Sequence, residues 1–335
     1  MGFLISCASN LLCKRIENTR ALACKFRTFR YLVGTRAAQR MLASCTGFSA
    51  VSPSACSARM NVVDRTPAWE NTFLTLQPTF VVEDWAKARP LMAEFLDKTR
   101  TQRGAMYSGW TVCGDKLFCR EAFAESAFLL EHLSSVRPSL EALMEPGIAR
   151  LLEMQLHGPA DELSKCEAAM EGLDAQAFEV FSGFTTLVRP YGGMSRGQGF
   201  SSLQPSFTVA DWDAAAPLLE RCVALMRAEK GCIFHGWTRS GDRLVCRQAH
   251  ASTDGLLAHL GNSEVQQTLA ELCDGPAILD GVQLHGPMSA LEACALAEYL
   301  GVGVEGFAID SGFQKYELTG YNMGLLDLSK GQGGW

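Results

Sequence analysis

The sequence predicts an α+β fold in which two tandem ferredoxin-like units close a pseudo-dimeric α/β barrel within one chain. Three observations predict it. Residues 73–133 and 200–260 are identical at about 27 of 61 aligned positions. Each copy extends over roughly 115 residues, which is the size of a domain and too long for a solenoid repeat. Within a copy, the hydrophobic pattern follows the order β-α-β-β-α-β.

A strand followed by a helix opens each copy. Residues 73–80 form the predicted strand, and Pro78 suits an edge or an end of the sheet, because proline has no backbone N–H to donate. The helix begins near Glu83 and Asp84 and runs to about Arg100, with apolar side chains at helical spacing.

A hairpin follows, formed by residues 105–112 and 117–123 across Gly114 and Asp115. A glycine at the first central position suits a type II′ turn. This register places a tryptophan opposite a cysteine and a glycine opposite an arginine. The predicted pairs are Trp110 with Cys119, Gly109 with Arg120, Trp237 with Cys246 and Gly236 with Arg247. Tryptophan and arginine therefore point to opposite faces of the sheet, and both faces are expected to be covered.

The remaining elements add a helix and a strand to the ferredoxin-like order. They are a helix at 125–144, a strand at 151–156, a short helix at 159–170 and a last strand at 177–184. The first unit therefore covers residues 69–190 and the second 200–320. A glycine-rich linker at 191–199 joins them, and a glycine-rich tail follows at 321–335.

Each sheet has helices on one side only, which leaves its other face bare. Packing that face on a second sheet buries it, and this chain carries a second unit. We therefore expect a pseudo-dimer within one chain. A higher oligomer is compatible with this arrangement.

The first 66 residues differ in composition from the rest. Residues 1–60 hold nine Lys or Arg and one acid, Glu17, a net charge of +8, and the chain's net charge of −6 leaves −14 for the remainder. Arginine among Ser, Ala and apolar residues is typical of an organellar transit peptide, and we expect a mitochondrion rather than a plastid. Cleavage is expected near Arg40 or as far along as about Arg65. A disordered basic tail is a second interpretation.

A third interpretation of the leader is N-terminal acylation, because Gly2 and Cys7 fit that pattern, and this would attach the chain to a membrane. No run of about 18 apolar residues predicts a spanning helix. The acidic body argues against a nucleic-acid partner. The 13 cysteines show no Cys-x-x-Cys spacing, and we expect them to be reduced. We predict no metal centre and no cofactor.

The repeated unit resembles a known family. The likeness rests on Gly104, Tyr107-Ser108-Gly109-Trp110, Asp115-Lys116-Leu117, Glu121 and residues 127–133, and in the second copy on Gly231, Phe234-His235-Gly236-Trp237, Asp242-Arg243-Leu244 and residues 255–260. Over about 60 residues of each copy, this pattern is similar to the antibiotic biosynthesis monooxygenase-like (ABM) family of dimeric α/β-barrel domains. Typical members close the barrel with two chains, whereas here two halves of one chain would do so.

The resemblance implies a range of functions. Family members include cofactor-free oxygenases of polycyclic phenols and quinols, haem-degrading enzymes and domains without demonstrated activity. Family enzymes commonly carry an acid on the third strand. The first copy has Glu121 at this place and the second has Gln248, so the acid cannot be essential in both halves.

Residues that recur in both copies are the candidates for a site. His132 and His259 are candidate catalytic bases, because imidazole titrates near neutral pH, and the alternative is a packing role. Arg120 and Arg247 are candidates for holding an anionic or enolate oxygen. Their alternative is a salt bridge with Asp115, Asp242 or Glu121.

Four further side chains are candidates for substrate binding: Trp110, Trp237, Tyr107 and His235. The tryptophans could stack on a flat aromatic ligand, although core filling is favoured. His157 and His285 precede Gly-Pro, where a hydrogen bond to the turn is expected. His235 and His250 occur only in the second copy, and metal binding there would need a third ligand that the sequence does not supply.

Two functions follow. The first is a cofactor-independent monooxygenase acting on a small apolar, aromatic or quinol-type ligand in an organelle. The second is a non-catalytic organellar binding or assembly protein that uses the duplicated barrel as a scaffold. Retention of both histidines and both arginines favours the first. Divergence at Tyr107/Phe234, Ser108/His235 and Phe123/His250 favours the second, or a single working half.

Overall fold

The computed structural model describes residues 73–171, 173–188, 199–294, 298–299, 302–315 and 317–318. Its contacts group the chain into two units, Met1–Arg65 and Thr66–Trp335. The predicted leader at 1–66, all of the predicted linker except Gly199, and the predicted tail at 321–335 lie outside the described residues. What was inferred for them stays a prediction.

The first half contains the predicted order of elements with an added helix pair and strand. They are β1 (Leu74–Val82), α3 (Trp85–Thr101), β2 (Ala105–Cys113), β3 (Lys116–Phe123), α4 (Ser126–Leu143), β4 (Ala149–Gly158), α5 (Ala160–Ser164), α6 (Glu167–Met170) and β5 (Gln176–Thr185). The Asp84 carboxylate caps α3 by accepting from the backbone N–H groups of Ala86 and Lys87. This cap explains why the helix begins where the sequence predicts it.

The second half repeats this order of strands, with differences in its helices. Its elements are β7 (Ser201–Val209), α7 (Trp212–Ala228), β8 (Cys232–Ser240), β9 (Arg243–His250), α8 (Thr253–Leu260), α9 (Ser263–Cys273), β10 (Ala277–Gly286), α10 (Met288–Cys294) and β13 (Glu305–Gln314). The single helix α4 of the first half is divided here into α8 and α9. Gly261 ends α8, and the Asn262 side chain caps α9 by accepting from the N–H groups of Glu264 and Val265.

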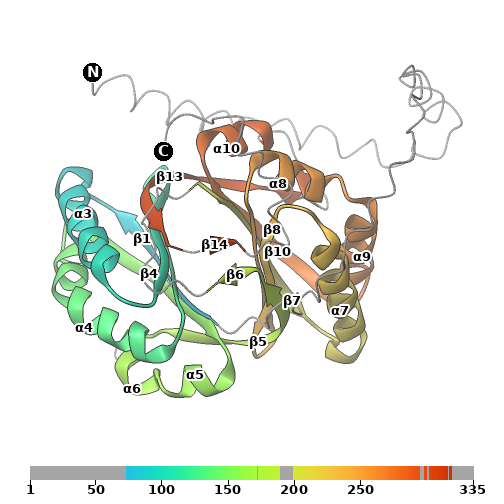
Figure 1. Ribbon diagram of the computed structural model, residues 1–335, viewed down its shortest axis with the longest axis horizontal. Helices are drawn as coiled ribbons and strands as arrows, with labels where there is room; N and C mark the ends of the chain where they lie inside the picture. The colour runs from blue at the N-terminus through green and yellow to red at the C-terminus, as the bar shows by residue number, and fades with distance from the viewer. Residues whose placement is uncertain are drawn as a thin grey trace, which may run out of the picture. The chain divides into compact units, whose positions relative to one another are not determined.

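Ten strands close into one barrel in the order β1-β3-β2-β13-β10-β7-β9-β8-β5-β4. The halves are joined at two seams, where β5 pairs with β8 and β13 pairs with β2, both antiparallel. In Figure 1 the helices lie around the outside of the barrel. Two short ladders, β6 (Leu187–Val188) with β14 (Glu317–Leu318) and β11 (Glu298–Tyr299) with β12 (Val302–Gly303), accompany it. The predicted fold class, a barrel closed by two units of one chain, is confirmed.

Both hairpins have the predicted register. Trp110 lies opposite Cys119 and Gly109 opposite Arg120, and the second half repeats these pairs. Gly114 and Gly241 have φ values of +64° and +62°, the sign that the first central position of a type II′ turn requires. The hairpin therefore forms where local turn chemistry places it.

The prediction that Pro78 marks an edge or an end of the sheet is wrong. β1 lies between β3 and β4, and Pro78 is opposite Met154 of β4. The ladder to β3 pairs Leu76 and then Thr79, so it skips the two residues between them. The missing N–H of Pro78 falls in this gap, which is how a central strand accommodates it.

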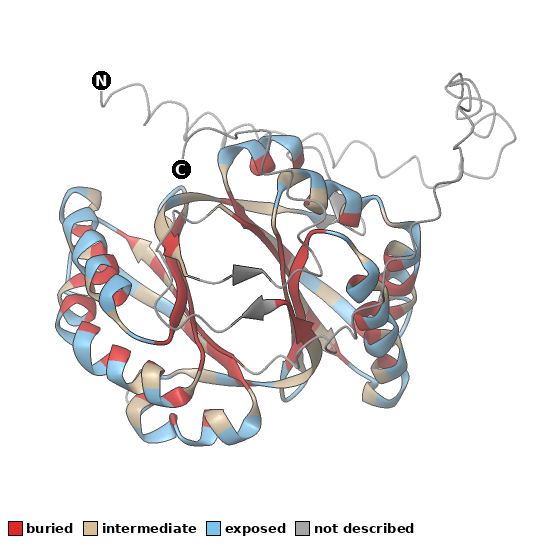
Figure 2. Cartoon of the chain, viewed as in Figure 1, coloured by how far each residue is buried: buried red, intermediate tan, exposed pale blue. Residues whose placement is uncertain are grey.

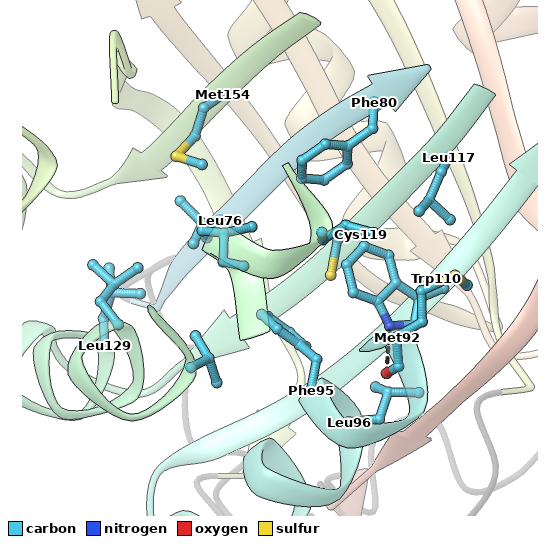
Figure 3. Close-up of a cluster of buried hydrophobic side chains, with 14 of the residues drawn as sticks. Leu76, Phe80, Met92, Phe95, Leu96, Trp110, Leu117, Cys119, Leu129 and Met154 are labelled. Atoms are coloured by element: carbon cyan, nitrogen blue, oxygen red, sulfur yellow. Dashed lines mark hydrogen bonds between the residues drawn. The ribbon is translucent and has the colours of Figure 1, made fainter. Parts of the chain in front are cut away.

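The two faces of the barrel wall have different partners. On the outer face, the Trp110 indole N–H donates to the Met92 carbonyl oxygen of α3 at 3.1 Å, and the Phe95 ring lies 5.2 Å away (Figure 3). Most residues of β1, β2, β3, β7, β8 and β9 and the inward faces of the helices are buried, whereas at least half of the residues of β5 and β13 are of intermediate exposure and the outer helix faces are exposed (Figure 2). Because side chains alternate along a strand, Gly109 and Arg120 point to the other face, which lines the lumen.

Candidate functional site

The barrel wall separates the candidate side chains into two sets. Trp110, Trp237, His132, His259 and His235 lie on the outer face, between sheet and helices. Arg120, Arg247 and Tyr107 face the lumen. The histidines and the arginines therefore do not form one catalytic group, and each face has to be considered by itself.

In the first half, His132 of α4 is fully buried and engaged at both ring nitrogens. Its Nε2 lies 3.1 Å from Glu121 Oε2, and its Nδ1 lies 2.8 Å from Gln102 Oε1. Ser108 donates to the other Glu121 oxygen at 2.8 Å. The rings of Phe95 and Phe123 pack against the imidazole, with centroids at 5.4 and 4.7 Å. These contacts engage both ring nitrogens of His132 and both oxygens of Glu121, whereas Gln102 Nε2 has no hydrogen-bond partner in the described ranges.

The second half has the same arrangement with the acid and the amide exchanged. His259 Nδ1 lies 3.1 Å from Glu229 Oε2, and its Nε2 lies 3.1 Å from Gln248 Nε2. Because the amide nitrogen is a donor, Gln248 donates to Nε2, and Nδ1–H donates to Glu229. Asn262 also donates to Glu229, at 2.8 Å. The carboxylate that the second copy lacks on its third strand thus comes from the residue that ends α7.

Two more histidines enter the outer face of the second half. His235 stands where the first half has Ser108, and His250 stands where it has Phe123. The His250 ring lies 4.9 Å from the His259 ring, and the His235 ring lies 5.4 Å from Trp237. His235 Nε2 is 3.4 Å from the sulfur of Cys246. Three imidazoles and an indole are therefore gathered between β8, β9 and the helices that cover them.

Several polar atoms of this group have no hydrogen-bond partner within the described ranges. They are both ring nitrogens of His250, Nδ1 of His235 and Nε1 of Trp237. Their first-half counterparts are an apolar ring, a serine bonded to Glu121 and an indole bonded to Met92. Buried polar groups normally have partners, so these atoms are suited to a bound molecule that carries polar groups.

Burial sets the protonation of these histidines. Desolvation by burial, together with the nearby His259, lowers the pKa of His235 to about 3. Burial also lowers the pKa of His250 well below its usual value, helped by His259 and His235. Both imidazoles are therefore neutral at pH 7, with a lone pair that can accept a proton.

The lumen holds the arginines. Arg247 donates through Nη1 to the Thr75 hydroxyl and lies over the Phe73 ring at 5.6 Å. Arg120 lies over the Phe200 ring at 5.1 Å. The salt bridges to Asp115, Asp242 or Glu121 considered above do not form, because the two aspartates are exposed in the hairpin turns and Glu121 binds His132 on the outer face.

The prediction that His157 and His285 bond to their turns is wrong. His157 Nδ1 lies 2.8 Å from the Thr238 hydroxyl, and His285 Nδ1 lies 2.8 Å from the Thr111 hydroxyl. Each bond joins a strand of one half to a strand of the other. These histidines therefore hold the seams together, a role that depends on the closed barrel.

Reasoning from the sequence missed Gln102, Glu229 and the importance of His250. The first two lie 30 residues before the histidines they bind, at helix ends. The alignment of the two copies contained a signal. Where the first copy has a glutamine (Gln102) the second has a glutamate (Glu229), and where the first has a glutamate (Glu121) the second has a glutamine (Gln248). Such a reciprocal exchange indicates two positions that share one partner.

Three negative findings apply to the described residues. No group of three or more His, Cys, Asp or Glu side chains has a geometry suited to a metal ion. The eight cysteines in these ranges form no disulfide. None of the helices is long and apolar enough to cross a membrane.

No family model and no curated protein sequence matches the chain. Solved structures do show similarity. MupZ from Pseudomonas fluorescens is 25% identical, with 32% of this chain and 90% of that chain covered and a TM-score of 0.31. An anthrone oxidase-like protein is 12% identical, with 64% and 94% covered and a TM-score of 0.36. A monooxygenase-like protein from Listeria innocua is 8% identical, with 64% and 94% covered and a TM-score of 0.32.

Proposed function

We propose that the second half is a cofactor-independent monooxygenase for a small hydroxylated aromatic compound, such as a naphthol or quinol. The observation that carries the proposal is the set of buried nitrogen atoms without partners on His250, His235 and Trp237. This region combines apolar and aromatic side chains with buried nitrogen atoms that lack partners, and a flat ring with a hydroxyl group fits both features. The ring packs between apolar and aromatic side chains, and the hydroxyl bonds to an imidazole.

The chemistry follows from the neutral imidazoles. A phenol hydroxyl placed against His250 donates its proton to the ring nitrogen, and the phenolate that forms stabilises the resulting imidazolium. The electron-rich anion then reacts with O2. For a naphthol, one ring C–H becomes C=O, and the second oxygen atom leaves as water with both hydrogens, so that C10H8O and O2 give C10H6O2 and H2O. The Glu229–His259 pair lies beside His250 and orients this region.

The first half provides an internal comparison. Both ring nitrogens of its equivalent histidine, His132, lie within hydrogen-bond distance of Glu121 and Gln102, and the position of His250 is taken by Phe123. Activity in the second half alone is consistent with the divergence of the two copies. The first half then acts as the structural partner that closes the barrel.

The test is oxygen uptake by the full-length protein with a panel of naphthols and quinols, in air and without oxygen. We expect uptake above the buffer rate, with one atom of labelled O2 in the product. His250→Leu should lower the rate at least tenfold. Phe123→Leu makes the same replacement at the equivalent position of the first half and should retain the rate.

Two results would argue against this function. If the wild-type protein consumes oxygen no faster than buffer with every compound, the enzymatic proposal fails, and the scaffold function becomes the better explanation. If His250→Leu and Phe123→Leu lower the rate equally, the second half is not the site. A fluorescence binding titration with the same compounds then separates lost binding from lost turnover.

We also propose that the leader at 1–66 directs the chain into a mitochondrion. Support comes from its charge of +8 over residues 1–60 and its arginine-rich composition. Isolated mitochondria should import and shorten the full chain only when their membrane is energised. Membrane attachment that is lost in Gly2→Ala, without shortening, would instead favour acylation.

A further inference from the structure

We propose that the barrel lumen binds an oxyanion, in the form of an aromatic carboxylate, on one edge of the Arg247 side chain. This site is separate from the outer-face site of the proposed function. The barrel wall lies between them, because Arg247 and Trp237 alternate across paired strands. Either site can therefore exist without the other.

Arg247 has hydrogen-bond donors that the described residues do not use. Its side chain is buried, with 1% exposure, and points from β9 into the lumen. Nη1 donates to the Thr75 hydroxyl of β1, a strand on the opposite side of the barrel. Nε and Nη2 have no hydrogen-bond partner in the described part of the chain. The bond to Thr75 therefore holds the guanidinium in place with two donors left over.

The two remaining donors of Arg247 have a geometry that suits an oxyanion. Nε–H and Nη2–H lie along the same edge of the planar guanidinium and point in the same direction. Parallel donors of this kind bind both oxygens of a carboxylate, or two oxygens of a phosphate. The bond to Thr75 uses Nη1, which does not belong to this edge of the guanidinium. The atoms that remain thus form the oxyanion-binding edge.

The charge of Arg247 also favours a bound anion. Arginine stays protonated at neutral pH, so the guanidinium brings a positive charge into the lumen. Among the buried residues of the described ranges, Glu121 is the only carboxylate. It lies on the outer face and binds His132 and Ser108. Within the described ranges, no buried carboxylate therefore neutralises Arg247, and a buried charge requires a counter-ion.

Aromatic side chains surround the Arg247 guanidinium, and these apolar surroundings favour an aromatic acid over inorganic phosphate. The Phe73 ring lies beneath the guanidinium, and Phe234 packs edge-on to Phe73 at 5.4 Å. Tyr107 stacks with Phe234 at 6.4 Å. A ring attached to a carboxylate can pack on these side chains while its oxygens reach Nε and Nη2.

The test measures binding to the full-length protein, which is unfolded in urea and refolded in the presence of the probe so that a buried site can fill. The probes are 2-naphthoate and inorganic phosphate, at constant ionic strength set with chloride. We expect 2-naphthoate to bind at least tenfold more tightly than phosphate and to raise the melting temperature. Equilibrium dialysis gives the stoichiometry, which should be one per chain.

Variants assign the site. Arg247→Gln should abolish the binding of 2-naphthoate, whereas Arg221→Gln, which removes a surface arginine paired with Glu271, should retain it. If Arg247→Gln does not fold, Arg247→Lys keeps the charge without the paired donors and should bind at least tenfold more weakly. Equal binding by the Arg247 variants and wild type, or no binding of either probe by wild type, overturns the proposal. Tighter binding of phosphate supports the oxyanion edge and overturns the aromatic acid.

Discussion

Lowering the pH from 7.5 to 5.5 should destabilise this protein far more than an ordinary domain. Four buried histidines are responsible: His157, His235, His250 and His285. Desolvation by burial lowers the pKa of each, to about 3 for His235 and well below the usual value for the others. In the unfolded chain the same side chains titrate near pH 6.5. Below that pH the unfolded state takes up protons that the folded state does not.

The magnitude follows from this difference in bound protons. Stability contributed by these groups is complete above pH 6.5 and is lost as the pH falls toward their folded pKa values. At pH values below 6.5 and above its folded pKa, each histidine lowers the free energy of unfolding by about 1.4 kcal/mol per pH unit. Between pH 7.5 and 5.5 the four together cost about 5 kcal/mol, which approaches the whole stability of a typical domain.

Urea unfolding at the two pH values, at fixed ionic strength, measures this loss. The double variant His235→Ser, His250→Phe places the residues of the first half in the second and should lose only about half as much. Carboxylates contribute little here, because groups such as Glu162, with a pKa of about 2, titrate at lower pH. A loss below about 1 kcal/mol in the wild type, or the same loss in both proteins, would show that these histidines are not buried and neutral.

Two matched pairs of variants test the packing by urea unfolding of the ligand-free protein. Trp110→Phe should lower the free energy of unfolding by about 1 kcal/mol more than Trp237→Phe, because only the Trp110 indole donates to a described acceptor; equal losses would contradict this. Gly183→Ala should cost about 3 kcal/mol, because its Cβ would lie 2.5 Å from the His235 carbonyl oxygen across a seam. In the control variant Gly281→Ala, the new Cβ would lie 3.9 Å from the nearest side chain, and the free energy of unfolding should change by less than about 0.5 kcal/mol. A larger loss in Gly281→Ala than in Gly183→Ala would refute the seam geometry.

The local rules of the chain predicted much of this fold. The turn at Gly114 and Asp115 determined the hairpin register, and alternation along β2 and β3 placed Trp110 and Arg120 on opposite faces. Closure of the barrel followed from a bare sheet face and a second copy to cover it. Pro78 was misjudged because the gap in the β1–β3 ladder is a tertiary feature that has no local pattern.

The site was less predictable than the fold. Alternation shows that two side chains lie on different faces, but the histidines are carried by helices, and their depth depends on packing. The partners of His259 come from the end of α7 and from β9, and one partner of His157, Thr238, comes from the other half. These contacts exist only after the units are assembled. The sequence contained one indication of the His259 contacts, which was the exchange of acid and amide between the two aligned copies.

The central claim is that one chain closes its own barrel, since the lumen site, where Arg247 of one half donates to Thr75 of the other, depends on it. Hydrogen exchange of the full-length protein tests this at β5 and β13, the strands that each half pairs with the other. We predict that their amides are protected to the same degree as those of β1, and equally at low and high protein concentration. Rapid exchange in β5 and β13, or protection that disappears on dilution, would contradict closure within a single chain.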